Sequence, residues 1–375
     1  MQSIGSAASY RHKIAGEKRN DVESVPDQFR FEMLQRLPGW PEFLSRESTR
    51  VVDVLHRSVQ TVVYRIKGSD QSDCSEQGNV EAKREVAELG AVVEQADFVV
   101  KVCDRPESIL REQAAYEHVV RPLSLPSPEM ILSYAGNPVS WIIYRDNRLQ
   151  SIGTDALLFL DGLRVACALH QHDPRTIPLH RDLASHTPDF FIAVREVRST
   201  PFSRYCKALD SFAWARASDV KLLQVLHHKL CVSCDDDPLL AIKVLCHGDL
   251  HLGNLMWSSI DERLNIIDWE FVHCDYIYFD LFQLLDATSP FIPLQRVMGR
   301  VDALRAYYDC NQAVQKQVAR RDFEQGYMRF AATYLYWIMN RMIDDLEANR
   351  HDVSQLMRQR VETVAALVEI ASSYT

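Results

Sequence analysis

The feature that most constrains this 375-residue chain is the segment 246–280, in which separated polar residues alternate with short apolar runs. A strand-like run over 243–246 leads into His-Gly-Asp-Leu-His-Leu-Gly-Asn. A second run, 255–257, follows, and a polar turn leads back into a third run, 264–267. The pattern predicts a strand, a short loop and a β-hairpin that together place polar side chains at the ends of buried strands.

Three polar side chains of this segment suit the transfer of a phosphoryl group. That reaction needs a carboxylate that accepts the proton of the acceptor hydroxyl, and oxygen ligands for the Mg²⁺ that bridges the phosphates. Asn254 lies five residues after Asp249, which is the Asp-to-Asn spacing of a kinase catalytic loop. Asp268 follows the apolar pair Ile266 and Ile267. We therefore expect Asp268 at the end of a buried strand, facing the same metal ion as Asn254.

The motif as a whole resembles a known family signature. His247-Gly-Asp-Leu-His-Leu-Gly-Asn254, followed by Ile267-Asp-Trp-Glu270, is similar to the signature of the aminoglycoside phosphotransferase and choline kinase family. That family lies within the protein-kinase-like superfamily. The resemblance implies an α+β, bilobal protein-kinase-like fold, with a small β-rich N-lobe and a larger, mostly helical C-lobe.

The resemblance also implies roles for individual residues. Asp249 is expected to be the catalytic base, and Asn254 and Asp268 are expected to bind Mg²⁺. His247, which opens the motif, and Asp280, in Tyr-Phe-Asp-Leu, are expected to support the loop.

Two departures from protein kinases favour a small-molecule acceptor. His251 stands where a Ser/Thr kinase has a lysine two residues after its catalytic aspartate. Trp269 follows the metal aspartate, where protein kinases continue Phe-Gly. We expect His251 to brace the loop. Two alternatives from other classes remain open: an atypical protein kinase and a catalytically idle nucleotide-binding protein.

Residues for the nucleotide are expected upstream. The segment 97–103 alternates like a strand, so Val99, Lys101 and Cys103 share one face. The resemblance implies that Lys101 reaches the α and β phosphates of ATP, and that Glu112, in a helix-like run over 108–116, pairs with it. The alternative for Lys101 is a solvated lysine on an edge strand.

A second upstream feature is the loop expected to cover the phosphates. The runs 51–55 and 61–66 predict a hairpin whose connection, 56–60, contains no glycine. The family resemblance implies a serine-bearing loop instead, with Ser58 as the phosphate contact. The missing glycines leave GTP possible beside ATP.

The resemblance also sets the predicted domain boundaries. Residues 1–28 are a polar tail, 29–145 the nucleotide-binding N-lobe, and 146–375 the catalytic and substrate-binding C-lobe. The insert 67–95 begins small and polar, so it is expected to be mobile. Tyr144 lies in the hinge predicted near 143–147, where the resemblance implies that backbone groups contact the nucleotide base. Helices are expected over 154–170, which ends in His170, and over 312–324, 327–347 and 353–372.

The composition, 47% apolar and 25% charged, is ordinary for a globular protein. No apolar run has the length of a membrane span, and the N-terminus lacks the blocks of a signal peptide. Nine scattered cysteines indicate reduced thiols, so we expect a cytoplasmic protein without a membrane partner. Cys231 and Cys234, near His227 and His228, suggest a zinc site, but no second pair at finger-like spacing completes it, so the interpretation without metal is favoured and zinc stays an open alternative.

The net charge of −9 argues against nucleic acid as a partner. It fits an amine-bearing acceptor drawn to acidic residues and to cation-π walls. The candidate acidic residues are 235–237, Glu270, Asp275 and 344–347, and the candidate aromatic residues are Trp269, Tyr334, Tyr336 and Trp337. The alternatives are that the acidic residues lie on solvated surfaces and that the aromatic residues lie in the core.

The sequence therefore predicts an ATP- or GTP-dependent, Mg²⁺-requiring phosphotransferase that acts on the hydroxyl of a small molecule, such as an aminoglycoside-like antibiotic or an amino alcohol. Sugars and nucleosides stay open as acceptors, and so does the oligomeric state.

Overall fold

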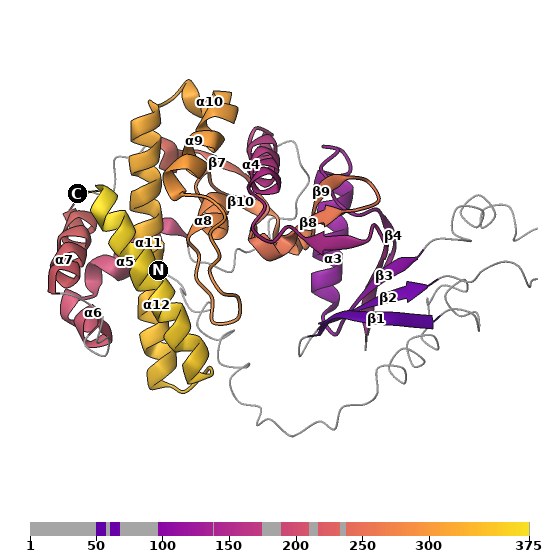
Figure 1. Cartoon of the computed structure of the whole chain (residues 1–375), viewed down its shortest axis with the longest axis horizontal. Helices are drawn as coiled ribbons and strands as arrows, with labels where there is room; N and C mark the ends of the chain where they lie inside the picture. The colour runs from indigo at the N-terminus through magenta and orange to yellow at the C-terminus, as the bar shows by residue number, and fades with distance from the viewer. Residues whose placement is uncertain are drawn as a thin grey trace, which may run out of the picture. The chain divides into compact units, whose positions relative to one another are not determined.

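The computed structural model describes residues 50–57, 61–67, 97–137, 139–174, 189–209, 217–232 and 238–374. The chain forms two compact units, Met1–Val102 and Cys103–Thr375 (Figure 1). Several predictions lie outside the described residues: the tail 1–28, most of the insert 67–95, Ser58, Cys234 and the acidic run 235–237.

The first unit contains the predicted hairpin and the lysine strand. Strand β1 (Arg50–Arg57) pairs antiparallel with β2 (Thr61–Lys67), with two register shifts along β1. Strand β3 (Phe98–Cys103) lies beside β2. Valine and isoleucine favour these strands because branched side chains pack well on a pleated surface. The buried side chains include those of Tyr64, Ile66 and Phe98.

The second unit begins with helix α3 (Pro106–Ala115), which continues as a π-helical segment, η3 (Tyr116–Val120). Pro106 suits the first helical position because its missing N–H has no helical partner there. Strands β4 (Met130–Tyr134) and β5 (Ser140–Arg145) pair antiparallel. Ile109 of α3 packs with Ile142 of β5 in a small apolar cluster.

Two small sheets frame the segment 246–280. Strand β7 (Lys243–Cys246) pairs with β10 (His273–Tyr276). Strands β6 (Leu149–Ser151), β8 (Leu255–Ser258) and β9 (Arg263–Ile266) form an antiparallel sheet in the order β6-β8-β9. The predicted strand, loop and hairpin are confirmed, and β6 is an additional partner of the hairpin.

Helices make up most of the remaining second unit. Asp155 caps α4 (Ala156–His170) by accepting hydrogen bonds from the amides of Leu157 and Leu158. The others are α5 (Phe190–Ser199), α6 (Phe202–Leu209), α7 (Ala217–Val232), α8 (Phe279–Leu285), α9 (Arg300–Cys310), α10 (Gln312–Gln315), α11 (Arg320–Glu347) and α12 (Val353–Tyr374). A β-sheet region followed by a mostly helical region confirms the predicted fold class.

One helix prediction is wrong. The helix expected over 312–324 ends at Gln315, and α11 begins at Arg320 and runs without a break to Glu347. Gly326 lies buried inside α11. A glycine inside a helix costs only about 1 kcal/mol relative to alanine, and the many buried side chains of α11 offset that cost.

Among the residues described, no helix combines the length and the apolar character that crossing a membrane requires.

Candidate functional site

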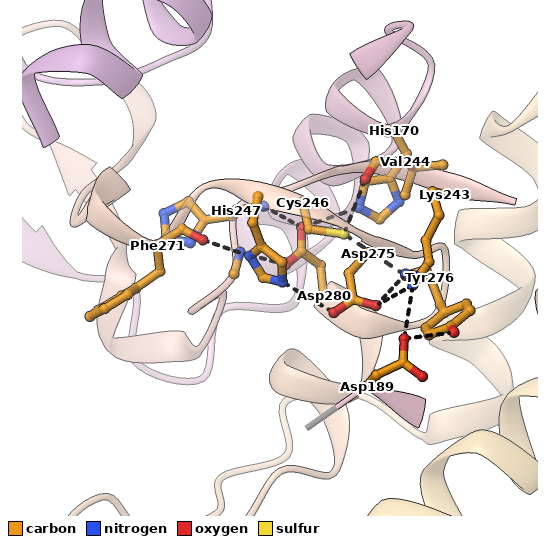
Figure 2. Close-up of polar contacts among 12 residues, drawn as sticks. His170, Asp189, Lys243, Val244, Cys246, His247, Phe271, Asp275, Tyr276 and Asp280 are labelled. Atoms are coloured by element: carbon orange, nitrogen blue, oxygen red, sulfur yellow. Dashed lines mark hydrogen bonds and ion pairs between the residues drawn. The ribbon is translucent and has the colours of Figure 1, made fainter. Parts of the chain in front are cut away.

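The loop between β7 and β8 is held at its start by the carboxylate of Asp280. The amide of His247 donates to Asp280 Oδ2 at 2.7 Å, and the amide of Gly248 donates to Oδ1 at 3.0 Å (Figure 2). Asp280 lies in the first turn of α8 and is fully buried. Both carboxylate oxygens therefore fix the backbone that leads into Asp249.

A buried histidine from α4 supports this carboxylate. His170 Nε2 lies 3.1 Å from Asp280 Oδ2, and Nδ1 lies 2.6 Å from the hydroxyl oxygen of Tyr307. That hydroxyl accepts a hydrogen bond from Asn311, so its own proton points to His170, which in turn donates to Asp280. Burial opposes the charge of Asp280, but the hydrogen bond and the positive potential of His170 hold its pKa below the usual value.

His247 links the loop to the strand end that precedes Asp268. Its Nδ1 accepts the amide hydrogen of Asp249 at 3.3 Å, so its Nε2 carries the proton and donates to the carbonyl oxygen of Ile267 at 3.0 Å. The ring packs edge-on against Trp269. Burial lowers the pKa of His247 in spite of the nearby Asp280. A neutral imidazole with one fixed tautomer thus joins the Asp249 loop to the Asp268 turn.

Asn254 and Asp268 lie at adjacent ends of the paired strands β8 and β9. The register pairs Leu255 with Ile266, and the amide of Ile267 donates to the carbonyl oxygen of Asn254 at 3.1 Å. Asp268 follows with a left-handed backbone, φ +64°, which is uncommon for a residue other than glycine. Such an outlier costs free energy and concentrates at functional sites.

Asn254 also contacts Asp249 directly. Its buried side-chain amide donates to the carbonyl oxygen of Asp249 at 2.8 Å, which leaves its own carbonyl oxygen for another ligand. An amide oxygen and a carboxylate on neighbouring strand ends are the hard oxygen donors that Mg²⁺ takes. The residues present therefore fit a Mg²⁺ ion, held by Asn254 and Asp268.

His251 braces the loop, as expected. Its Nδ1 accepts the amide hydrogen of Gly253 at 3.0 Å and caps the short helix η6 (Leu252–Asn254). Its Nε2 lies 3.6 Å from Asp249 Oδ2. The Asp249 side chain, 36% exposed, therefore has one face against His251 and the other open.

Helix α3 is tied to the turn that follows Asp268. The Ser108 hydroxyl donates to Glu270, in η7 (Trp269–Phe271). One turn further along α3, the buried Glu112 accepts a 2.5 Å hydrogen bond from the Tyr144 hydroxyl of β5. Burial and then Glu112 raise the pKa of Tyr144 well above its usual value, so this hydroxyl keeps its proton. Two of the predicted nucleotide residues thus contact each other.

Lys101, the third of these residues, is buried on β3 in the first unit. Its pairing with Glu112 stays a prediction.

Two tyrosines and two aspartates among the residues proposed to attract an amine are engaged with other parts of the second unit. Tyr334 and Tyr336 of α11 are buried in the core, which is the alternative that the sequence left open for them. Asp275 contacts His273 at 3.2 Å and Lys243 at 3.4 Å. Asp344 contacts Arg204 at 2.5 Å. These side chains are engaged in packing and ion pairs that stabilise the second unit.

A cavity of about 310 Å³ opens beside Asp249. One wall is the Asp249 loop, with His251 and Leu252, and the other is the end of α8 with the segment 287–295 that follows it. This segment was not predicted from the sequence. Its signal was an apolar run, Phe-Ile-Pro-Leu, that directly follows a polar turn and has no helical or strand period.

The suggested zinc site has one described cysteine. Cys231 Sγ lies 3.9 Å from both ring nitrogens of His227, and His227 Nε2 lies 3.3 Å from the carbonyl oxygen of Val197. Burial raises the pKa of the Cys231 thiol, which opposes the thiolate that zinc needs.

Comparison with solved structures finds chains that share this fold. The chain is similar to a macrolide 2'-phosphotransferase type I, with a TM-score of 0.52 and 12% identity over 90% of this chain and 97% of the other. An aminoglycoside phosphotransferase from Alicyclobacillus acidocaldarius gives a TM-score of 0.51 and 13% identity, over 90% and 95% of the two chains. At such identities the likeness shows the fold. No curated protein matches the sequence.

A family comparison goes further. The model of the phosphotransferase enzyme family, APH, matches residues 85–311, which is more than half of the chain and includes β3, α3 and the whole segment from β7 to α9. The resemblance predicted from the motif is thereby confirmed. The chain belongs to the phosphotransferase enzyme family and is a small-molecule kinase with the family's protein-kinase-like fold.

Proposed function

We propose that this protein transfers the γ-phosphoryl group of ATP or GTP to a hydroxyl of a small molecule, with Asp249 as the base and Mg²⁺ held by Asn254 and Asp268. The observation that carries the proposal is the position of Asp249. Its backbone is fixed by Asn254, while its carboxylate lines a cavity large enough for part of a small molecule.

In the proposed reaction, the acceptor hydroxyl lies in the cavity and donates a hydrogen bond to Asp249. The acceptor oxygen forms a bond to the γ-phosphorus as the bond to the bridging β–γ oxygen breaks. The hydroxyl proton passes to the Asp249 carboxylate, and the nucleoside diphosphate leaves. A bound Mg²⁺ supplies charge neutralisation for the phosphates. His251 Nε2 at 3.6 Å and the side-chain amide of Asn254 at 3.5 Å both lie beside Asp249 Oδ2 and restrict where the carboxylate can point.

We propose nucleotide roles for residues outside this loop. Lys101 is assigned to the α and β phosphates, Glu112 to the orientation of Lys101, Ser58 to a phosphate contact, and Tyr144 to the edge of the base. The hydrogen bond from Tyr144 to Glu112 supports a shared position for two of these residues.

The net charge of the chain suggested an amine-bearing acceptor, such as an aminoglycoside or an amino alcohol. Asp275 and Asp344, two of the acidic residues that would attract an amine, are paired with other side chains and do not line the cavity. The cavity therefore supports a hydroxyl-bearing acceptor, and the amine is not a requirement of the proposal.

The test is release of ADP and GDP with Mg²⁺ across a panel of hydroxyl compounds: aminoglycosides, macrolides, choline, ethanolamine, sugars and nucleosides. Acceptor-dependent release that Asp249→Asn abolishes is the expected result. Release that is equal in both proteins would exclude Asp249 as the base. Autophosphorylation with no response to any acceptor would favour the atypical protein kinase, and nucleotide binding without any turnover would favour an idle binding protein.

A further inference from the structure

We propose that the acceptor is a neutral, amphipathic hydroxyl compound, such as a glycoside with an apolar substituent, and that Gln283 and the segment 287–295 select it. This inference rests on the proposed function, because it assigns the cavity beside Asp249 to the acceptor.

The cavity wall has almost no charge. Among the described lining residues, the ionisable ones are Asp249 and His251, both on the catalytic loop. The wall opposite is neutral, and its large side chains are those of Leu284, Ile292 and Leu294. Ile292 is 45% exposed and its neighbour Phe291 is 67% exposed, so apolar surface continues from the cavity toward solvent. An acceptor with an apolar part can bury it here.

Hydrogen-bonding groups in the wall divide into two kinds. The hydroxyls are used internally: Thr288 bonds to Thr363 at 2.7 Å, and Ser289 accepts the amide hydrogen of Phe291 at 3.1 Å. Within the described part of the chain, no hydrogen bond engages the side-chain amides of Gln283 and Gln295. Each amide offers a donor and an acceptor, which match a hydroxyl or a carbonyl of a neutral ligand.

The segment is built before any ligand binds. Arg358 of α12 donates to the carbonyl oxygen of Pro290 at 2.7 Å, and Gln359 donates to that of Thr288 at 2.9 Å. Cavities that are formed in advance and apolar, with few polar groups, are typical sites for small molecules. The wall therefore selects an acceptor by its shape and by hydrogen bonds to uncharged groups.

A cationic acceptor would find little counter-charge in the described wall. An ammonium group taken from water needs a counter-charge, and Asp249 is the one carboxylate in the described wall. A neutral acceptor needs no counter-charge from this wall.

The first experiment compares matched acceptor pairs. An alkyl glucoside is paired with its amino sugar counterpart, and choline is paired with its neutral isostere, in which carbon replaces nitrogen. We expect kcat/KM to be at least about tenfold higher for each neutral member. A tenfold difference is roughly the free energy of one hydrogen bond, or of burying one unpaired charge. We also expect KM to fall as the alkyl chain lengthens. Preference for the cationic members, or no effect of chain length, would overturn the inference.

The second experiment tests whether Gln283 and Ile292 cause this selectivity. Gln283→Leu should raise KM for the alkyl glucoside about tenfold with kcat nearly unchanged, since it removes a binding contact and leaves the base in place. Gln312→Leu, at the start of α10 and outside the wall, is the matched control and should behave as wild type. Ile292→Ser should abolish the dependence on chain length. Equal KM values in Gln283→Leu and wild type would contradict the assignment.

Binding measured by saturation-transfer NMR separates the two proposals. Suppose that no compound is phosphorylated, but that the alkyl glucoside binds and Gln283→Leu abolishes that binding. The proposed reaction is then wrong, and the proposed ligand class is supported. If amine-bearing acceptors are phosphorylated in preference to neutral ones, then the proposed reaction is supported and the proposed ligand class is wrong. If the neutral glucosides neither bind nor react, the ligand class is wrong.

Discussion

A Cβ atom on Gly248 would lie 2.1 Å from the carbonyl oxygen of Phe271, far inside the contact distance of carbon and oxygen. Gly248 precedes Asp249, and Phe271 closes the short turn that follows Asp268. The loop of the proposed base and the turn of the proposed metal ligand therefore touch through their backbones. Gly248 also has φ +88°, a conformation that side chains disfavour.

Gly248→Ala should consequently destabilise the second unit and displace Asp249. We expect a loss of about 2 to 4 kcal/mol in the free energy of unfolding, from backbone strain together with the overlap at Phe271. Urea titration measures it. Gly153→Ala is the matched control, because Gly153 also has positive φ but open space around it. It should lose only about 1 kcal/mol. Equal losses of unfolding free energy in the two variants would show that the overlap with Phe271 does not contribute to the destabilisation.

Asp249→Asn should leave folding and nucleotide affinity unchanged while kcat falls by about 10² to 10⁴. The side chain is partly exposed, and its Oδ2 lies 3.6 Å from His251 Nε2, so removing its charge disturbs little else. Steady-state kinetics with any accepted substrate, together with nucleotide titration, measure both quantities. Asp309→Asn, on exposed α9 surface, is the control for a change of charge. A kcat within about twofold of wild type would remove Asp249 from the mechanism.

Asp268→Asn should raise the Mg²⁺ concentration needed for half-maximal activity by about tenfold or more, since a neutral amide is a weaker ligand than a carboxylate. Asparagine is the appropriate replacement because it tolerates the left-handed backbone, φ +64°, that Asp268 adopts. The measurement is activity across a Mg²⁺ titration at fixed nucleotide. An unchanged Mg²⁺ requirement would contradict the assignment, and a lower melting temperature would point to a structural role instead.

The parts of this site that the sequence predicted are those determined locally. Apolar runs and a polar turn predict the β8–β9 hairpin, and strand pairing then brings Asn254 and Asp268 together. Tyr307 was not predicted, because it reaches His170 across 137 residues and nothing in its own surroundings signals that contact.

The cavity wall escaped prediction for a similar reason. The segment 287–295 has no helical or strand period, and its position is set by α12, through Arg358 and Gln359. The break expected near Gly326 is a different error: a local preference was overridden by packing along α11.

The buried histidines of the site predict a dependence of stability on pH. Burial lowers the pKa of His247 in the folded state, whereas the unfolded value is about 6.5. Below about pH 6.5, His247 therefore binds a proton in the unfolded chain but not in the folded one. The free energy of unfolding falls as the pH decreases toward the folded pKa. His247→Gln keeps the donor to Ile267 and should reduce this slope.

His273 should show the opposite sign. Burial opposes its charge, but the hydrogen bonds to Asp275 and Phe271 outweigh burial and raise its pKa. Its stabilising contribution is complete below about pH 6.5 and is lost as pH rises through the folded pKa. His273→Gln should therefore remove the loss of stability as pH rises above about 6.5 and leave the slope below about pH 6.5 nearly unchanged. Urea unfolding of wild type and both variants between about pH 5 and 8 measures the slopes. Identical slopes in wild type and His247→Gln would mean that the folded His247 binds its proton as readily as the unfolded chain does.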